Sequence, residues 1–219
     1  AILTIWVLIT IVFFLVRLMP GDPFTSAKLT DEVRANMEAY YGFDKPMIVQ
    51  YGIYMVNLLH GDFGYSMKYT NKTVNDIIGE TFPFSADLGI RALLLALSIG
   101  LVLGIVSARN RGKKLDFFCV IVAVLGTSIP DFIMGAALQY FFGIKWGLFP
   151  VARYEGIEYT ILPAFALAFY TLASVSRIMR ASMLEVTSQD YIKTARSKGV
   201  SELRITCKHQ IRNAIMPVM

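Results

Sequence analysis

Residues 91–114 read RALLLALSIGLVLGIVSARNRGKK, an apolar run that gives way to a strongly basic connection. An α-helix rises about 1.5 Å per residue, so about 20 residues cross the roughly 30 Å of hydrocarbon in a bilayer. The run from Ala92 to Ala108, with its flanking residues, fits one such crossing. The short connection RNRGKK has four basic residues in six positions, and the positive-inside rule places such connections in the cytoplasm. The stretch therefore predicts a transmembrane helix that ends on the cytoplasmic side.

The composition of the chain also indicates a membrane protein. Its 219 residues are 55% hydrophobic and 17% charged, with a mean hydropathy of +0.54, whereas soluble domains carry about 25% charged residues. The net charge is +5 (21 basic minus 16 acidic residues), and the basic residues cluster beside the apolar runs, which indicates membrane orientation and no nucleic-acid partner. The two cysteines and two histidines lack disulfide or metal-ligand spacing, so no metal site is predicted.

Three further apolar runs predict additional spans: Ala1–Val16, Phe117–Phe142 and Ile161–Met179. The first run is short, and we expect that the start of its helix is missing from the sequence. The run from 117 to 142 has 26 residues and would extend roughly 39 Å as one helix, so it must tilt, project outward or break. Gly126 and Pro130 are the expected site of the break, because proline removes a backbone donor and crowds the preceding turn.

We expect an all-α, polytopic membrane protein with four visible spans. The predicted organisation, in chain order, is a first transmembrane helix (1–19), an extracytoplasmic loop subdomain (20–85), a transmembrane core of helices two to four (86–180), a cytoplasmic loop (181–212) and the truncated start of a further span (213–219). The loop subdomain is rich in turn signals such as MPGDP and HGDFGYS and is too polar for lipid. It predicts a short helix that starts at Thr30 or Asp31 and stops at Gly42. The subdomain either returns the chain to the membrane or docks an external partner.

The segment after the fourth run is basic and amphipathic. Residues 177–212 carry eight basic and three acidic residues, so they belong on the cytoplasmic face with RNRGKK. Asp190–Lys198 predicts a short helix, and Gly199 stands where a left-handed C-terminal cap is expected. A second helix is predicted from Ser201 onward, with an apolar stripe (Leu203, Cys207, Ile211, Ile215) and a basic stripe (Arg204, Lys208, Arg212). The resulting hairpin binds either a partner protein or the headgroups of anionic lipid.

Three polar residues in the long third run are candidates for a substrate pathway. Carboxylates inside a bilayer are costly and usually face a cavity, so Asp131 is the first candidate, and Gln139 and Ser128 accompany it. The alternative for Asp131 is a capping role at the helix that resumes at Phe132, because exposed amides there favour an anion.

Other charged and small residues have expected structural roles. Asp87 and Arg91, four residues apart, predict an ion pair at the membrane interface. Gly100 and Gly104 form a GxxxG pattern that permits close helix packing. Arg17 is expected to extend to the outer interface.

Several segments resemble one family of transporters. DYIKTARSKGV (190–200) followed by HQIRNAIMPV (209–218) resembles the cytoplasmic coupling loop of ABC importer permease subunits, in the variant of the oligopeptide, dipeptide and nickel branch. FFLVRLMPGDPF, YGFDKPMIVQY, GDFGYS, SIPDF and WGLFPVARY are similar to that branch in the same order. KWGLFPV and LQYFFG resemble the B subunits of oligopeptide permeases more than the nickel branch. Lys193 and Thr194 replace the glutamate and first alanine of the general loop pattern, and Pro217 comes late, so sugar and amino-acid permeases are a poor guide to this loop.

The resemblance implies the type I importer fold with six spans and no catalytic residue in this chain. The residues that it assigns to coupling with an ATPase are Asp190, Tyr191, Thr194, Ala195, Arg196, Lys198 and Gly199. Ala195 would allow close approach of the partner, while Arg196 and Lys198 would pair with its acids or carbonyls. The implied partners are a second permease subunit, two ATP-binding cassette subunits, an extracytoplasmic peptide-binding protein and membrane lipid.

The function implied by the resemblance is ATP-driven import of oligopeptides. The sequence contains no GxxxxGK[ST] motif, so ATP and Mg would be used by the partner ATPase subunits, and no cofactor is expected on this chain. A dipeptide or nickel permease of the same family is the alternative. From another class, an ion-coupled secondary transporter would use Asp87 and Asp131 as titrating groups, and a non-transporting scaffold would only bind lipid.

Overall fold

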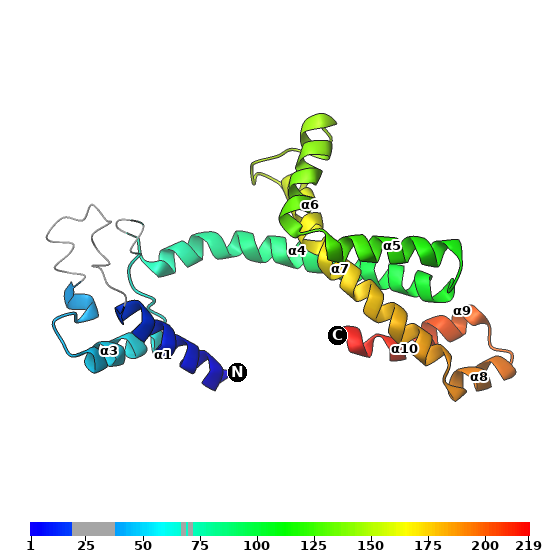
Figure 1. Ribbon diagram of the computed structural model, residues 1–219, viewed down its shortest axis with the longest axis horizontal. Helices are drawn as coiled ribbons and strands as arrows, with labels where there is room; N and C mark the ends of the chain where they lie inside the picture. Colours follow the sequence, from blue (N-terminus) through cyan, green and yellow to red (C-terminus); the bar gives the residue numbers. More distant parts are fainter. Residues whose placement is uncertain (19–37, 67–68, 70–71) are drawn as a thin grey trace. The chain divides into compact units, whose positions relative to one another are not determined.

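The computed structural model describes residues 1–18, 38–66, 69 and 72–219. Within these ranges the chain is helical, and β-structure is limited to one antiparallel bridge between Tyr65 and Thr73. The chain divides into two compact units, Ala1–Pro83 and Phe84–Met219. The all-α prediction is confirmed, and Figure 1 follows the helices in chain order.

The first unit is built on two apolar helices, α1 (Ile2–Leu18) and α3 (Met47–Leu59). Phe13 is the buried residue of α1, and its ring stacks on an aromatic ring of α3 with the centroids 5.3 Å apart. Arg17 donates a hydrogen bond of 2.6 Å to the side-chain oxygen of Gln50. The arginine that was expected to extend to the interface is therefore held against α3.

Gly42 ends a short helical stretch over residues 38–41 and adopts a φ of +65°. Glycine enters this left-handed conformation at little cost, so the predicted stop is confirmed. The predicted start at Thr30 or Asp31 and the MPGDP turn lie outside the described residues.

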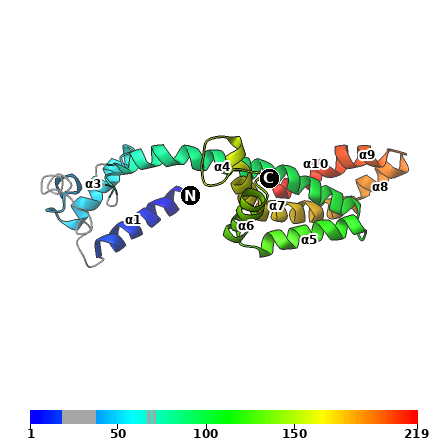
Figure 2. The ribbon, with the colours of Figure 1, turned by 90° about the horizontal axis from the view of Figure 1, so that it is seen from above.

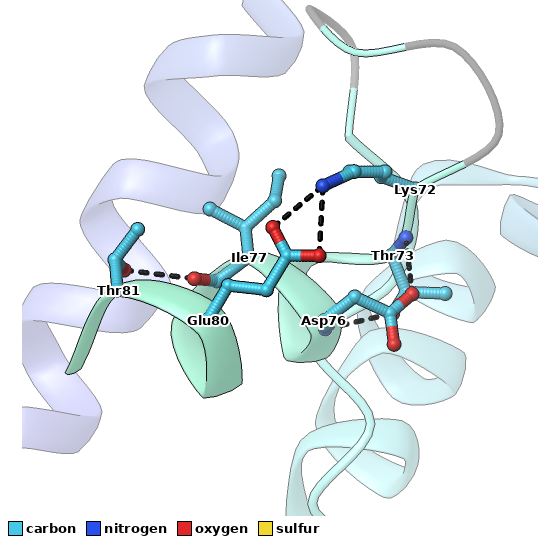
Figure 3. A network of polar contacts seen from close by, with 6 residues as sticks. All are labelled: Lys72, Thr73, Asp76, Ile77, Glu80 and Thr81. Carbon is cyan, nitrogen blue, oxygen red and sulfur yellow. Dashed lines mark hydrogen bonds and ion pairs between the residues drawn. The ribbon is translucent and has the colours of Figure 1, made fainter. Parts of the chain in front are cut away.

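The longest helix of the described residues, α4 (Val74–Arg109), starts with a reciprocal cap. The Oγ of Thr73 accepts a hydrogen bond of 3.0 Å from the amide of Asp76, and the carboxylate of Asp76 accepts one of 3.0 Å from the amide of Thr73. Lys72 pairs with both carboxylate oxygens of Glu80, at 2.8 and 2.5 Å (Figure 3). The cap satisfies an amide that the helix itself leaves unpaired.

The core of the second unit is α7 (Ile157–Thr187), which packs on α4 and on α5 (Lys114–Ser128). Figure 2 shows α5 alongside α7. A Cβ added at Gly100 or Gly104 of α4 would lie 2.8 or 2.7 Å from a backbone carbonyl oxygen of α7. Because no side chain fits there, the glycines allow the two backbones to approach, and the prediction of close packing is confirmed.

The long third run breaks at Pro130, between α5 and α6 (Asp131–Leu138). α6 continues as a π-helical segment, η1 (Gln139–Lys145). The chain bends by 108° between α5 and the combined α6–η1 segment. The break at the proline confirms the prediction. The expected contribution of Gly126 is wrong, because α5 continues through this residue and the missing Cβ instead admits α7.

Two helices among the described residues, α4 and α7, are long and apolar enough to cross a membrane. The bent pair of α5 and α6–η1 is a third crossing if it is taken as one broken span. α1 is a shorter apolar helix of 17 residues. The four predicted apolar runs correspond to α1, α4, the bent pair and α7.

Beyond α7 the chain turns back in a hairpin of short helices. These are α8 (Asp190–Ser197), α9 (Glu202–Ile205), the π-helical η2 (Thr206–Gln210), α10 (Ile211–Ala214) and the 3-10 turn η3 (Met216–Val218). The predicted helix over 190–198 and the reversal after it are confirmed. We call α8, the turn and α9 the hairpin, and η2 to η3 the return segment.

The predicted apolar stripe of the second helix is wrong in its first half. Leu203 is 66% exposed and Cys207 is exposed, while the last two residues of the stripe are half-buried. The π-helical η2 widens one turn in the middle, so residues spaced by four no longer follow one face. Ala214 of the return segment is fully buried and packs with two buried methionines of α7.

Candidate functional site

The tip of the hairpin is a glycine turn between α8 and α9. The amide of Val200 donates to the carbonyl of Ala195 at 3.2 Å, and the amide of Gly199 donates to the carbonyl of Arg196 at 2.9 Å. This pair of bonds is the Schellman arrangement, which satisfies the last carbonyls of a helix. Gly199 has a φ of +72°, a conformation that costs residues with a Cβ roughly 1–2 kcal/mol. The predicted glycine cap is confirmed.

An ion pair closes the hairpin across this turn. The Nε of Arg196 lies 2.7 Å from one carboxylate oxygen of Glu202, and a second guanidinium nitrogen donates to the other oxygen at 3.3 Å. The guanidinium lowers the pKa of the Glu202 carboxyl, and the carboxylate raises the pKa of Arg196. Both side chains are largely exposed, so the pair adds about 0.2–1 kcal/mol to the turn. Arg196, expected to pair with a partner protein, is paired within the chain, whereas Lys198 is exposed.

Side-chain contacts attach the hairpin to the return segment and the return segment to α7. Ile192 of α8 is fully buried. The side-chain amide of Gln210 donates to the hydroxyl of Thr187 at 2.9 Å, and that of Asn213 donates to the hydroxyl of Tyr191 at 3.0 Å. The hairpin therefore has a fixed orientation relative to the end of α7.

The residues predicted to couple the chain to an ATPase lie on α8 and in the turn after it. The exposed ones are Asp190, Tyr191, Thr194, Arg196, Lys198 and Gly199. Ala195 is half-buried. Lys193 pairs with Asp190 at 2.9 Å and lowers the pKa of that carboxyl. The arrangement presents a short, pre-formed helix end that another protein can enclose.

The three candidates for a substrate pathway are not brought together. Asp131 is exposed at the start of α6, and its carboxylate makes no hydrogen bond within the described part of the chain. The N-cap of α6 is Pro130, so the side-chain cap weighed for Asp131 does not form, although its charge lies in the first turn. Ser128 donates to a carbonyl of its own helix at 2.8 Å. Gln139 lines a groove of about 390 Å³, which the other two candidates do not line.

This groove lies between η1, the loop of residues 150–154 and the start of α7, where Tyr159, Leu162 and Pro163 line it. Its loop is held to α4 by the hydroxyl of Tyr154, which donates to the carboxylate of Asp87. Asp87 also accepts a hydrogen bond of 2.8 Å from the Nε of Arg91. The predicted ion pair is confirmed. The tyrosine was missed, because no spacing in the sequence connects it to α4.

A buried carboxylate among α4, α5 and α7 was also missed. Asp116 is 6% exposed and accepts hydrogen bonds from the hydroxyl of Ser107 at 2.5 Å and from the amide of Gly112 at 2.9 Å. Arg180 donates two more, from Nε at 2.8 Å and from a terminal nitrogen at 2.9 Å. The available signal was an acid in the first turn of one apolar helix and a base inside another, because charges in apolar helices usually pair.

Residues 100–219, which contain the hairpin and this buried carboxylate, match the protein family described as the binding-protein-dependent transport system inner membrane component. The chain belongs to this family. It is 43% identical to the dipeptide transport system permease protein DppB of Bacillus subtilis, over 99% of the chain and 70% of that protein. It is 41% identical to the oligopeptide transport system permease protein OppB of Salmonella typhimurium and 40% identical to OppB of Escherichia coli, over 100% of the chain and 72% of each relative.

Membership of the binding-protein-dependent transport inner membrane component family confirms the resemblance to ABC importer permeases. The chain is a transport component and a multi-pass protein of the cell membrane. The matched region starts within α4 and includes the broken span, α7 and the hairpin, so most of the groups described above lie inside the domain that defines the family.

Proposed function

We propose that this chain is the membrane-spanning permease subunit of an ATP-driven importer of oligopeptides. The observation that carries the proposal is the hairpin, which lies in the matched family region and presents α8 with Gly199 at its tip. A short helix held in one orientation fits a groove on an ATPase subunit. The identity of 40–41% to proteins named oligopeptide permeases supports the substrate class.

In the proposed mechanism, the hairpin converts closure of two ATPase subunits into movement of the spans. Each ATPase subunit would carry along the helix that lies in its groove. The bond between Asn213 and Tyr191 attaches the hairpin to the return segment, and the bond between Gln210 and Thr187 attaches the return segment to α7. The pull would thus reach a helix that packs on α4 and α5. Ala195 and Lys198 are the proposed contacts with the ATPase. The small side chain of Ala195 would allow close approach, and the charge of Lys198 would pair with acids or carbonyls of the ATPase.

The proposed assembly contains a second permease subunit, two ATP-binding cassette subunits and an extracytoplasmic peptide-binding protein, in membrane lipid. The cassette subunits would use ATP and Mg, and this chain is proposed to bind no cofactor of its own. The basic connection RNRGKK and the hairpin are proposed to face the cytoplasm, and residues 20–85 the opposite side.

The proposed route of the peptide passes the groove beside Gln139 and the break between α5 and α6. An exposed carboxylate suits the amine of a peptide, and Asp131 lies at this break without a bond to any described residue. Ser128, at the last turn of α5, is proposed to line the same route.

A dipeptide importer is the second candidate function. It is favoured by the identity of 43% to DppB of Bacillus subtilis and of 38% to DppB of Lactococcus lactis. The two candidates differ only in the length of the peptide, so one series of substrates separates them.

The experiment that tests the proposal is peptide uptake by the native assembly. The complex is isolated through a tag on this chain, its subunits are identified by mass spectrometry, and it is reconstituted in liposomes with the peptide-binding protein. We expect ATP on the hairpin side to drive uptake of labelled tetra-alanine more strongly than of di-alanine, and the reverse order would favour a dipeptide importer. A catalytically inactive ATPase subunit is the control and should abolish uptake. Uptake that follows a proton gradient without ATP, or isolation without an ATPase, would contradict the proposal.

A further inference from the structure

Asp116 is the point at which three helices meet through one carboxylate. Its oxygens accept from Ser107 on α4, from Gly112 in the α4–α5 turn and twice from Arg180 on α7. The side chain of Asp116 is 8% exposed and that of Arg180 is 30% exposed. Two parallel bonds to a guanidinium fix the angle between the two groups as well as their distance. The relative orientation of α5 and α7 is therefore set at this pair.

The chemistry of this pair favours a role in orientation over a role in stability alone. Removing two charges from water costs several kcal/mol per ion, and well-packed apolar side chains of similar volume often stabilise a helix interface as well. The next buried residues along α5, Cys119, Ala123 and Gly126, carry no charge. An ion pair in which both carboxylate oxygens accept hydrogen bonds fixes the relative orientation of the two helices, which apolar packing alone does not.

Arg180 is connected to the hairpin through α7 and the return segment, whose Asn213 donates to Tyr191 of α8. It lies on α7, whose last residue is Thr187, and the helix has no proline in that stretch because its internal proline is Pro163. Met179 and Met183, on either side of Arg180, are buried against Ala214 of the return segment. A displacement of the hairpin would therefore move Arg180 with it.

The other side of the pair leads to α4 and α5. A Cβ at Gly104 of α4 would lie 2.7 Å from the Cβ of Met179, so α4 contacts α7 one turn before Ser107 bonds to Asp116. From Asp116, α5 runs without interruption to Ser128, where the broken span bends. The pair thus stands between the hairpin and the two helices that lead away from it.

We propose that Asp116 and Arg180 form a coupling joint, a pair of positioning residues through which movement of the hairpin is passed from α7 to α4 and α5. The inference rests on the proposed function as a permease driven by an ATPase. Without the joint, α7 follows the hairpin while α4 and α5 lag behind, so ATP is hydrolysed but less peptide is imported for each ATP.

The test compares peptide uptake with ATP hydrolysis in the reconstituted importer, with labelled tetra-alanine and di-alanine as probes. We expect Asp116→Asn to lower the ratio of peptide imported to ATP hydrolysed about tenfold, while hydrolysis by the complex stays within about twofold. Arg180→Lys should lower the ratio about threefold, because a lysine keeps the charge but cannot form the paired bonds. Arg177→Lys is the matched control, since Arg177 is an exposed arginine one turn earlier on α7, and its ratio should equal that of the wild type.

Ser107→Ala keeps the experiment decisive if Asp116→Asn fails to accumulate in the membrane. It removes one of the bonds to Asp116 and leaves the ion pair, so the subunit should assemble normally and the ratio should fall about twofold. An unchanged ratio in Ser107→Ala and Arg180→Lys, or uptake and hydrolysis that fall together in proportion to the amount of assembled complex, would overturn the coupling joint. These outcomes leave the proposed function intact as long as the wild type imports peptide with ATP. ATP-independent uptake by the wild type would overturn both.

Discussion

Asp116 and Asp131 stand in the first turns of two consecutive helices, and their surroundings are opposite. Asp116 is enclosed by α4 and α7, and both of its oxygens are occupied by hydrogen-bond donors. Asp131 is exposed, and no described residue donates to its carboxylate. Both acids lie in the first turn of their own helix, Asp116 as the third residue of α5 and Asp131 as the first residue of α6. The helix packed beside it decides whether the acid is a structural contact or an available charge.

The difference follows from how α7 meets the two halves of the broken span. α5 packs on α7 along buried small residues, which brings Asp116 within reach of Arg180. α6 also contacts α7, but it is bent by 108° from α5 and has no buried residue. A buried charge must be paired because an uncompensated one is costly. The acid just after the break is exposed and is not subject to this cost.

Alanine at the two acids should give very different losses of stability. We expect Asp116→Ala to lower the free energy of unfolding by about 3–5 kcal/mol, because Arg180 is left as a partly buried charge without its partner. Asp131→Ala should change it by no more than about 0.5 kcal/mol. Denaturant titration of the subunit in detergent, followed by its helical circular dichroism, measures both. Equal losses would show that enclosure by α7 is not the relevant difference.

Two glycines of α4 offer the same contrast between an enclosed and an open position. A Cβ at Gly104 would lie 2.7 Å from the backbone oxygen of Ser176, whereas a Cβ at Gly89 has nothing within 4 Å. We expect Gly104→Ala to destabilise the protein by about 1–3 kcal/mol through overpacking. Gly89→Ala should stabilise it by up to about 1 kcal/mol, because alanine is the better helix former. The same denaturant titration applies, and a stabilising Gly104→Ala would contradict the close approach of α4 and α7.

Gly199 in the hairpin is an open position, where the cost of adding a side chain depends on the backbone conformation alone. A Cβ at Gly199 meets nothing within 4 Å, so any cost of Gly199→Ala comes from its φ of +72° and is expected to be about 1–2 kcal/mol. Gly199→Asn is the matched control and should lose less, since asparagine tolerates this conformation. Amide hydrogen exchange in residues 190–202 measures the opening of the turn. We also expect Gly199→Ala to reduce peptide uptake without reducing the amount of subunit in the membrane. Equal exchange in both variants and the wild type would contradict the strained turn.

The smallest of these effects is expected at the exposed ion pair of the hairpin. Arg196 lowers the pKa of Glu202, so the pair adds stability above the ordinary glutamate pKa of about 4.3, and this stability is lost as the pH falls through the lowered value. We expect the turn to open more readily below about pH 4, by no more than about 1 kcal/mol. Glu202→Gln should remove this pH dependence. Lys193 also lowers the pKa of Asp190, so hydrogen exchange is compared in the Asp190→Asn background. A pH dependence that survives Glu202→Gln would contradict the assignment.

Features that depend on neighbouring residues in the sequence could be predicted. Three features follow from local chemistry: the hairpin with its glycine cap, the break at Pro130 and the GxxxG contact. In each case the glycine or proline that causes the feature stands at the position where the feature occurs. The ion pair of Asp87 and Arg91 is local in the same sense, since one helical turn joins them.

Features that depend on which helix faces meet could not be predicted. Asp116 and Arg180 lie on different helices, and only the packing of α5 on α7 brings them together. Gly126 is a residue type that often interrupts helices, yet here it lies within α5 and allows close contact with α7. The exposed Leu203 belongs to a regular stripe that the wide turn of η2 displaces from the packed face. Each of these outcomes is a property of two elements, and a pattern within one element does not contain it.

The exposure of Cys207 gives the protein a natural attachment point for a reporter. It stands just beyond the hairpin, and Cys119, the other cysteine of the sequence, is buried. A thiol-reactive fluorophore or spin label will therefore modify the return segment without engineering. Its emission or mobility would then read out, in real time, when another polypeptide covers this side of the subunit.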